Sequence, residues 1–358
     1  MKRITYIALA AVLTGILIIG ATLFFTKGNI KTSYTFSGKN GKEAVVDDER
    51  KEYVAKENIT EIILCETSDS IKVEIGDVKA PIFSYMEGTM AGELVINESG
   101  KTITLKRDLK NAWSGIGFVG FDFTDYTTYV TLPKDYEGSL DLESTSGSIH
   151  VTGIETLTDL TTSSTSGNIQ ITDVISKKGI VAESTSGGIN ILKSETDRNI
   201  DAKSTSGSVS LENVKAGGNG NARSTSGSIK VTDASFGEYF SSSSSSGSEK
   251  LLNVATGKGL SVHTTSGSIN ADNTAVGNDV NFESSSGSIH FDNLACGNDI
   301  TMSATSGNIR GTISGKESDY SIITHTTSGS CNLDDSRSGD KELNANTSSG
   351  SIHIDFTK

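Results

Sequence analysis

The sequence predicts an all-β protein: a single-stranded parallel β-solenoid of about 20 residues per coil, preceded by an N-terminal transmembrane helix. Three observations indicate this fold class. A Ser-Gly motif recurs at a fixed interval, and apolar and polar residues alternate on both sides of each copy. The 358 residues also include 38 glycines but only 2 prolines, and aromatic residues make up 6%. This composition is typical of short strands joined by tight turns and argues against a helical bundle.

The chain begins with an apolar run. Residues 4–25 (ITYIALAAVLTGILIIGATLFF) are uncharged, and Lys2 and Arg3 precede them. As a helix, this run would rise about 33 Å, enough to cross the hydrocarbon core of a bilayer. It is longer than the core of a cleavable signal peptide, and it lacks an A-x-A cleavage site and a lipobox cysteine. We therefore predict a single-pass anchor in the cell membrane over residues 1–27, with the N-terminus cytoplasmic and the rest extracellular. A cleaved signal is the alternative.

Charge and cysteine content narrow the class of protein. The chain has 31 basic and 44 acidic residues, a formal net charge of -13. Such a surface repels phosphate backbones, so we predict no nucleic-acid partner. Cys65, Cys296 and Cys331 show no zinc-binding spacing and are too few for a disulfide framework. We expect them to be small packed residues, while a Cys296–Cys331 bridge stays open.

The Ser-Gly motif sets the period of the chain. Nine of its glycines follow one another at intervals of 20 residues, and two further copies come after steps of 22 and 21. They are Gly147, Gly167, Gly187, Gly207, Gly227, Gly247, Gly267, Gly287 and Gly307, then Gly329 and Gly350. A fixed period over so many copies indicates a solenoid, in which each repeat stacks on its neighbours.

Each repeat contains two short strands with one buried face. With the glycine as position 0, apolar residues stand at −7 and −5 and again at +2 and +4, which is the period of a strand. In the third repeat these residues are Ile180, Ala182, Ile189 and Ile191. Twenty residues cannot form a free-standing unit with its own core. They can form one coil whose strands pair with their equivalents in the coils on either side, about 4.8 Å away.

Stacked coils predict the shape and turns of the rod. Eleven coils would extend about 50 Å, and we expect right-handed winding because parallel crossovers prefer it. Five repeats have glycine at position +10, where we expect a second turn with positive φ. These glycines are Gly217, Gly237, Gly257, Gly277 and Gly297.

Serines precede each glycine. Positions −3 and −1, such as Ser164 and Ser166, are in phase with the buried positions, so we predict that both hydroxyls point inward and form a structural ladder. One repeat departs from the pattern: FSSSSSSGSEKLLNV places Glu249 at the buried position +2 and Ser242 at −5. Because burying an unpaired carboxylate is costly, we expect a local change of register there and the weakest coil of the rod.

These patterns divide the chain into four segments: an anchor (1–27), a polar spacer (28–57), a β-rich capping region (58–138) and a solenoid of eleven Ser-Gly repeats (139–358). Within the capping region, residues 59–76 resemble a degenerate coil and residues 93–108 a hairpin. Residues 113–129 concentrate aromatic side chains, which predicts a hydrophobic plug on the rod or a loop that contacts ligand or membrane. The chain ends without an evident cap, and exposed strand edges favour end-to-end self-association or a partner strand.

Signatures of catalysis are scarce. The sequence has no HExxH, GxSxG or Walker-type loop. Asp272 and Asn273 lie one coil from Asp292 and Asn293, an arrangement that would suit calcium, but Asx residues at turns also have purely backbone reasons. We predict no catalytic, metal-binding or cofactor-binding residue, no cofactor and no enzymatic activity.

The most regular outward feature is position −2. It holds Thr145, Thr165, Thr185, Thr205, Thr225, Thr265 and Thr305. A threonine column at strand spacing resembles the surfaces of ice-binding β-helices and of some sugar-binding proteins, so these seven residues are the predicted binding surface. Ice-binding surfaces generally have two neighbouring ranks, whereas position −4 is mixed here: Glu143, Glu183, Lys203, Arg223, His263 and Glu283. Threonine also simply suits an exposed strand position.

The segment YVTLPKDYEGSLDLESTSGSI (129–149), followed by the STSGSI array, resembles the bacterial putative-adhesin or toast-rack family of β-strand-repeat proteins. The resemblance covers residue 59 to the C-terminus. It implies a β-solenoid at the cell envelope beside a membrane span, and the family has no known catalytic residues to carry over.

Together these observations predict an exported bacterial envelope protein whose solenoid is a non-enzymatic binding or structural surface, as in an adhesin. Its predicted partners are the membrane, through the N-terminal helix, and cell-wall polymer, glycan or envelope protein. Two alternatives stay open: a regulatory or sensory envelope component that signals to a membrane partner, and a carbohydrate-active β-helix enzyme.

Overall fold

The computed structural model describes residues 34–37, 43–46, 48–110 and 125–357. The predicted anchor (1–27) and residues 113–124 of the aromatic segment lie outside these ranges. The predicted spacer (28–57) is covered only in part. Within the ranges, no helix is long and apolar enough to cross a bilayer. Helical structure there is limited to the 3₁₀ turn η1 (Glu317–Asp319).

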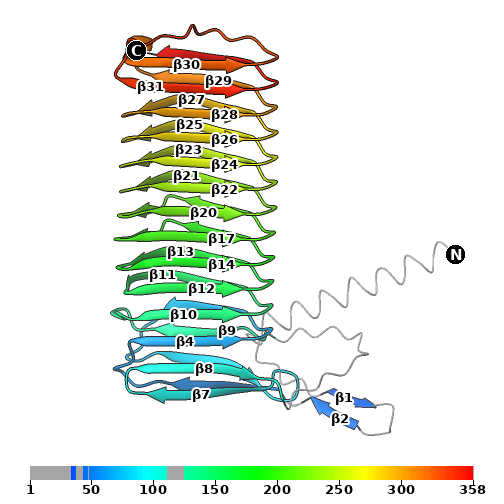
Figure 1. Cartoon of the computed structure of the whole chain (residues 1–358). Coiled ribbons are helices and arrows are strands. Elements are labelled where there is room, and N and C mark those ends of the chain that lie inside the picture. The colour runs from blue at the N-terminus through cyan, green and yellow to red at the C-terminus, as the bar shows by residue number, and fades with distance from the viewer. Residues whose placement is uncertain (1–33, 38–42, 47, 111–124, 358) are drawn as a thin grey trace, which may run out of the picture.

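The described chain winds into a rod of two long sheets whose strands are parallel except near the N-terminal end (Figure 1). The 14-stranded sheet has the order β30 (Tyr320–Thr326), β31 (Lys341–Thr347), β28 (Ile300–Ala304), β26 (Val280–Ser284), β24 (Leu260–Thr264), β22 (Phe240–Ser244), β20 (Gly220–Ser224), β17 (Asn199–Ser204), β14 (Gly179–Ser184), β12 (Asp159–Ser164), β10 (Ser139–Ser144), β4 (Glu61–Glu66), β8 (Thr102–Asp108) and β7 (Glu93–Ser99).

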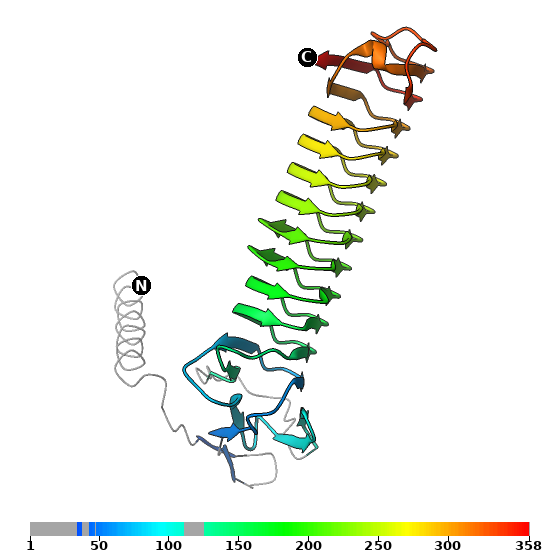
Figure 2. The same ribbon diagram turned by 90° about the vertical axis from the view of Figure 1, so that its left-hand side faces the viewer.

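The second sheet has 16 strands. Its order is β3 (Glu49–Val54), β6 (Ile82–Glu87), β9 (Thr128–Leu132), β5 (Ile71–Ile75), β11 (Ile149–Leu157), β13 (Ile169–Ser176), β15 (Ile189–Leu192), β18 (Val209–Glu212), β21 (Ile229–Phe236), β23 (Glu249–Thr256), β25 (Ile269–Val276), β27 (Ile289–Cys296), β29 (Ile309–Ser314) and β32 (Ile352–Thr357), with β16 (Glu195–Thr196) and β19 (Lys215–Ala216) beside this path. β1 (Tyr34–Ser37) and β2 (Glu43–Val46) pair as a separate hairpin. Figure 2 shows successive coils standing above one another, which confirms the predicted parallel β-solenoid.

Residues 20 positions apart stack on one another. Ile169 lies opposite Ile189, and Ile171 opposite Ile191, in the pairing of β13 with β15. The apolar side chains at −7, −5, +2 and +4 of the regular coils lie between the two sheets and belong to one hydrophobic cluster that runs the length of the rod. The predicted core is therefore confirmed. All three cysteines are free thiols, and Cys296 is the buried one.

The eight coils from Gly147 to Gly287 turn a corner at position +6. Residues there adopt a left-handed backbone, with φ of 53° at Asp173 and 54° at Asn293, which Asp and Asn tolerate better than most residues. The predicted positive φ at the +10 glycines is wrong. A Cβ on Gly237 would instead lie 2.1 Å from the carbonyl oxygen of Gly217, so glycine is needed there for close approach of neighbouring coils.

Asparagines at this corner form a ladder. Asn273 Nδ2 donates to Asn253 Oδ1 at 3.3 Å, and Asn293 Nδ2 donates to Asn273 Oδ1 at 3.1 Å. The asparagines weighed as calcium ligands thus support the corner. No group of three or more His, Cys, Asp and Glu side chains in the described ranges is placed to hold a metal ion.

One buried hydroxyl closes the Ser-Gly turn in most repeats, whereas the repeat of Gly307 has Ala304 at this position. Ser164 Oγ accepts a hydrogen bond from the N–H of Gly167 at 2.8 Å and donates one to the carbonyl oxygen of Gly147, in the preceding coil, at 3.2 Å. A Cβ on Gly167 would lie 1.9 Å from that same oxygen. The inward ladder is confirmed at position −3, but it is wrong at −1. Ser166 is exposed, because the chain leaves the strand alternation at the bend and turns positions −2 and −1 both toward solvent.

The repeat around Gly247 keeps its register. Glu249 lies opposite Ile229 and Ile269 without a shift, so the expected local change of register is wrong. Its side chain is fully buried, and neither carboxylate oxygen has a hydrogen-bond partner. Burial raises the pKa of Glu249 to about 8, and the nearby backbone N–H of Ser244, outside hydrogen-bond geometry, offsets only part of this shift. The side chain is accommodated because it is mostly protonated and neutral at pH 7, which avoids most of the cost of a buried charge.

The N-terminal end is a cap of modified coils. β4 and β5 pair parallel with β10 and β11 and form the predicted degenerate coil. The predicted hairpin is confirmed as β7 and β8, while β8 and β9 add a further coil. β6 and β3 then extend the 16-stranded sheet antiparallel. Residues 49–54 are therefore an edge strand and not a spacer. The charged residues of this strand make it resemble a spacer in the sequence. An edge strand tolerates such residues because main-chain hydrogen bonds hold it in the sheet.

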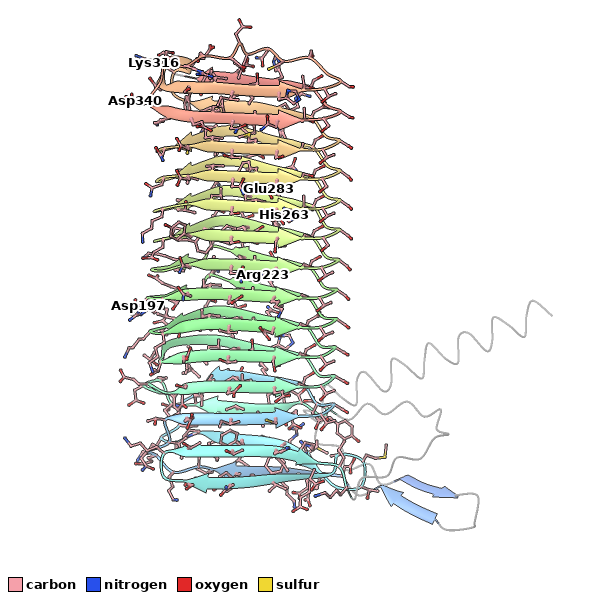
Figure 3. The ribbon with its side chains drawn as sticks, viewed as in Figure 1. Asp197, Arg223, His263, Glu283, Lys316 and Asp340 are labelled. Carbon is pink, nitrogen blue, oxygen red and sulfur yellow. The ribbon has the colours of Figure 1, made fainter. Side chains whose placement is uncertain are left out.

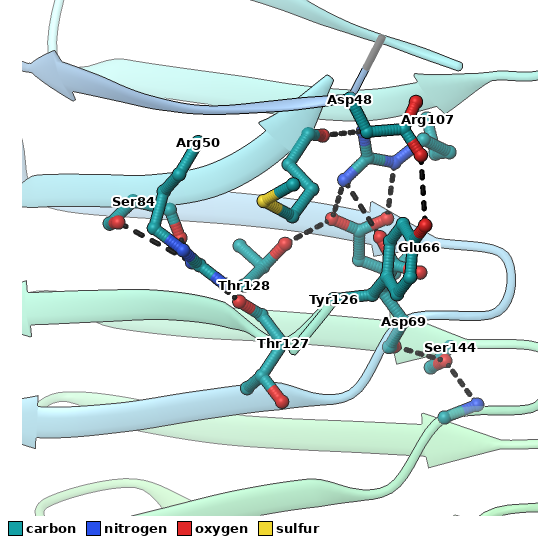
Figure 4. A network of polar contacts seen from close by, with 12 residues as sticks. Asp48, Arg50, Glu66, Asp69, Ser84, Arg107, Tyr126, Thr127, Thr128 and Ser144 are labelled. Carbon is teal, nitrogen blue, oxygen red and sulfur yellow. Dashed lines mark hydrogen bonds and ion pairs between the residues drawn. The ribbon is translucent and has the colours of Figure 1, made fainter. Parts of the chain in front are cut away.

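A buried ion cluster joins this cap to the first regular coil (Figure 4). Arg107 donates two hydrogen bonds of 2.8 Å to Glu66 and one of 3.1 Å to Asp69. Thr128 Oγ1 donates to Glu66 as well. Burial and the nearby charge of Glu66 raise the pKa of Asp69 to about 7. The carbonyl oxygen of Asp69 accepts a hydrogen bond from Ser144 Oγ, so the serine ladder begins at this cluster.

The last repeats stack in an order that differs from the sequence. β31 and β32 pair with β28 and β29, and β30 pairs with the far side of β31 (Figure 1). The 14-stranded sheet therefore ends at β30 and the 16-stranded sheet at β32. The N–H of Ile352 in β32 donates to the carbonyl oxygen of Ser330, so the expected bare final strand is wrong. Ile322 exchanges two main-chain hydrogen bonds with Ser336, so the segment after β30 folds over its edge. Gly329 and Gly350 both belong to a Ser-Gly motif, and this motif does not indicate which of their two coils lies at the end of the rod.

Candidate functional site

The predicted threonine column lies along the bend that borders the 14-stranded sheet. Thr145, Thr165, Thr185, Thr205, Thr225, Thr265 and Thr305 are all exposed. Main-chain hydrogen bonds hold them in line: the N–H of Thr165 donates to Ser144, and that of Thr185 to Ser164, both at 3.1 Å. Ser245 and Ser285 fill the two remaining places. The structure thus places all seven residues in one column with a step of about 4.8 Å.

A second exposed rank, which sequence reasoning missed, runs beside this column. It consists of Ser146, Ser166, Ser186, Ser206, Ser226, Ser246, Ser266, Ser286 and Ser306. The N–H of Ser166 donates to Thr145 at 3.0 Å, and that of Ser186 to Thr165 at 2.9 Å. We name positions −2 and −1 together the hydroxyl edge. The sequence signal for this second rank was the Ser-Gly pair that recurs in every repeat. A bend so tight that it requires glycine also ends the alternation of inward-facing and outward-facing side chains along the strand.

Position −4 projects from the adjoining face of the sheet. From coil to coil its residues are Glu143, Ser163, Glu183, Lys203, Arg223, Ser243, His263, Glu283 and Ser303. The basic residues stand in the middle of the rod with acidic residues on either side. Figure 3 shows Arg223, His263 and Glu283 on this face, where His263 Nδ1 lies 3.2 Å from Glu283 Oε2.

Two shallow hollows lie between position −4 and the hydroxyl edge. The first is lined by Glu143, Glu183 and Lys203 together with hydroxyls as far as Thr205. The second is lined by Lys203, Arg223 and His263 together with hydroxyls as far as Thr265. Both hollows are open and polar. Their regularly spaced hydrogen-bonding groups suit an extended, hydroxyl-rich chain laid on the surface rather than a small molecule enclosed in a pocket.

The repeats and the strands that precede them match a known sequence family. The family model described as Toastrack DUF4097 matches residues 59–251 and 237–358. The chain belongs to this family. The match runs from the degenerate coil to the C-terminus, so the cap from β4 onward and the last two coils lie within the Toastrack DUF4097 region, while β3 precedes it. The resemblance to the toast-rack family is thereby confirmed.

Two solved structures are similar to this Toastrack DUF4097 chain. A putative cell adhesion protein from Clostridium sporogenes is 10% identical, with a TM-score of 0.20, and the similarity covers 87% of this chain and 100% of that one. A putative adhesin from Bacteroides fragilis is 10% identical, with a TM-score of 0.31, and the similarity covers 87% of this chain and 97% of that one. No curated protein matches the chain. Membership of the family rests on the family match alone.

Proposed function

We propose that this protein is a non-enzymatic envelope protein whose rod binds cell-wall glycan along the hydroxyl edge. The proposal rests on one observation: two unbroken ranks of exposed hydroxyl groups run from the coil of Gly147 to the coil of Gly307. Each hydroxyl both donates and accepts a hydrogen bond. A rank repeated at about 4.8 Å offers an extended sugar polymer the same contact many times, so weak contacts add up along the chain.

The carboxylates of the first hollow support a binding role over hydrolysis. Glu143 and Glu183 are both exposed and are separated by a whole coil that carries Ser163. A glycosidase keeps one of its two carboxyl groups protonated by placing it in apolar surroundings. Neither glutamate has such surroundings. A carbohydrate-active enzyme would lose all turnover of its glycan when the responsible carboxylate is replaced by alanine.

The proposal includes the location of the rod. The apolar run at residues 4–25 anchors the chain in the cell membrane, with the N-terminus cytoplasmic and the solenoid extracellular. In that arrangement the rod stands away from the membrane and offers its long face to the surrounding polymer.

Co-sedimentation with bacterial cell-wall particles tests the proposal. We compare the full-length protein in non-ionic detergent with a variant in which Thr165, Thr185 and Thr205 are valine. Valine keeps the shape and strand preference of threonine but removes the hydroxyl, so we expect roughly tenfold weaker binding from three lost hydrogen bonds.

The matched control is Thr152→Val/Thr172→Val on the 16-stranded sheet, which should bind as the wild type does. Equal binding by the triple variant and the wild type would contradict the proposal. Wild-type retention no greater than that of an unrelated protein of equal charge would also contradict it.

A further inference from the structure

Adjacent cations line the second hollow, whereas Lys230 and Lys250, another register-paired set on the 16-stranded sheet, lie away from both hollows. Lys203 of β17 lies opposite Arg223 of β20 in the parallel register, and both side chains are exposed at position −4. Like charges opposite one another on adjacent strands lower the stability of a sheet. Glu183 lies opposite Lys203 on its other side, but the contact of Lys203 with Arg223 adds no stability to the sheet.

Neither cation is neutralised by an ion pair with a carboxylate of the described chain. Elsewhere on the rod, cross-coil pairs do neutralise lysines: Lys215 lies 2.7 Å from Glu195, and Lys258 lies 3.0 Å from Glu238. Arg223 instead donates from Nε to Asn221 Oδ1 at 3.1 Å. That contact orients the guanidinium group but uses only one of its five N–H donors.

The hollow brings these cations together with the hydroxyl edge. Its lining includes Thr205, Thr225 and Thr265 beside Lys203 and Arg223. A ligand that lies there meets hydroxyl groups on one side and positive charge on the other. Arginine and lysine both bind carboxylates and phosphodiesters, and arginine does so through two parallel hydrogen bonds.

An exposed aromatic ring stands on the same face. Tyr239 precedes β22, faces outward like Ser241 and Ser243, and is 52% exposed. A Cβ on Gly259, in the next coil, would lie 2.9 Å from the ring, so the glycine leaves room for the tyrosine to lean against the sheet. A ring held in this way offers an apolar surface with a polar tip. Lys258 Nζ lies 5.5 Å from the ring centroid, so this cation shares the ring with any sugar that contacts it.

We propose that the ligand of the hydroxyl edge is an acidic polysaccharide whose anionic groups bind Lys203 and Arg223 while its sugar hydroxyls contact the threonines and serines. This inference rests on the proposed glycan binding and specifies its ligand class. Glu183 and Glu283 border the basic stretch, so the anionic part of the contact extends over about three coil steps, roughly 14 Å. The carboxylates of uronic acids and the phosphodiesters of polyol-phosphate polymers share the required charge.

The rod supplies a matched pair of variants for the test. Lys203→Gln/Arg223→Gln removes two positive charges beside the hydroxyl edge. Lys230→Gln/Lys250→Gln removes two positive charges from exposed, register-paired positions on the 16-stranded sheet, away from both hollows. Both variants change the net charge equally, so only the location of the charge differs.

Binding of the full-length protein is measured on immobilised polygalacturonate, its methyl ester, poly(glycerol phosphate) and double-stranded DNA. We expect polygalacturonate or poly(glycerol phosphate) to bind at least about tenfold more tightly than the uncharged ester. Lys203→Gln/Arg223→Gln should lose roughly tenfold for the anionic polymer and little for the ester. The control variant should bind as the wild type does. The preferred anionic polymer identifies the recognised group.

Equal losses in the two variants would show that only net charge matters and would overturn the inference. Binding of DNA as tight as that of the acidic polysaccharide, with the same dependence on Lys203 and Arg223, would also overturn it. Wild-type binding that is equally tight for the ester and the acid would overturn the acidic ligand while glycan binding stands. Absence of binding to every polymer and to cell-wall particles would refute the proposed function itself.

Discussion

The ring of Phe236 occupies the volume that Gly220 leaves empty. A Cβ on Gly220 would lie 2.1 Å from a ring carbon of Phe236, and Phe236 stacks on Phe240 with centroids 4.5 Å apart. Other coils have a large residue at position −7 and a small one at +9, such as Ile200 with Ala216. This coil exchanges the two, so its cross-section keeps a similar volume.

This exchange predicts a compensating pair of substitutions. Phe236→Ala should destabilise the rod by about 3–5 kcal/mol because it opens a cavity. Gly220→Leu alone should also destabilise it, since the ring blocks the new side chain. The double variant should recover at least half of the loss, as measured by denaturant unfolding followed by circular dichroism. Additive losses would contradict the shared volume.

Neighbouring glycines in one turn should differ sharply in tolerance. A Cβ on Gly187 would lie 1.9 Å from the carbonyl oxygen of Gly167, whereas a Cβ on Gly188 would lie at an ordinary 3.5 Å from that of Ser208. We expect Gly187→Ala to cost about 3 kcal/mol or more and Gly188→Ala less than about 0.5 kcal/mol. Thermal unfolding of both variants checks this, and similar midpoints would be inconsistent with coil spacing as the reason for glycine.

Glu249 should make stability fall as pH rises. Its folded pKa of about 8 lies above the ordinary glutamate pKa of 4.5, so the folded state binds the proton more tightly than the unfolded state. This contribution is complete below pH 4.5 and is lost as pH rises toward 8, on the order of 3 kcal/mol by pH 7. Glu249→Gln should remove this dependence and raise the unfolding midpoint at pH 7.

The exposed Glu183 gives the control for this experiment. Glu183→Gln removes the same charge from the surface and should leave the slope of stability against pH unchanged. A slope that persists in Glu249→Gln would show that other groups, such as Asp69 in the cap, govern it.

The buried cluster of the cap depends on Arg107. Its side chain is 2% exposed and neutralises Glu66, which is fully buried. Arg107→Met should destabilise the cap by about 3–5 kcal/mol because it leaves a buried carboxylate unpaired. Lys106→Met, on the exposed side of the same strand, is the control. Adding Glu66→Gln to Arg107→Met should restore part of the loss in urea unfolding, and no restoration would argue against the ion pair.

The inserted last coil predicts an unusual effect of truncation. Removal of residues 341–358 takes away β31 and β32, the strands that β30 needs for pairing. Amide hydrogen exchange should therefore show lost protection in residues 320–334, which remain in the chain, and near-normal protection up to residue 296. Retained protection in β30 would mean that it pairs directly with β28 when the last coil is absent.

The sequence established the solenoid itself. The 20-residue period predicts which positions of each repeat are buried. It also predicts that equivalent residues of neighbouring coils, such as Ile169 and Ile189, lie opposite one another. The cap hairpin and the degenerate coil were also predictable, because they keep the alternation of strands. The edge strand β3 was not, since main-chain pairing leaves no apolar pattern when both faces of a strand are largely open to solvent.

The surface was predictable only in part. The threonine column follows from position −2 alone, but the second rank depends on where the bend ends the alternation. The sequence did not single out Lys203 and Arg223, because position −4 holds residues of several types. A list of those residues does not show that the two cations share a hollow with the hydroxyl groups.

Period, burial and the outward threonines were thus determined by the sequence, because in a stack of like coils each residue's surroundings are set by its own repeat. Tertiary structure alone decided the corner at +6, the survival of register at Glu249, and the insertion of the last coil. Those outcomes depend on how closely neighbouring coils approach and on which edge finds a partner. These are relations between distant residues that no single repeat encodes.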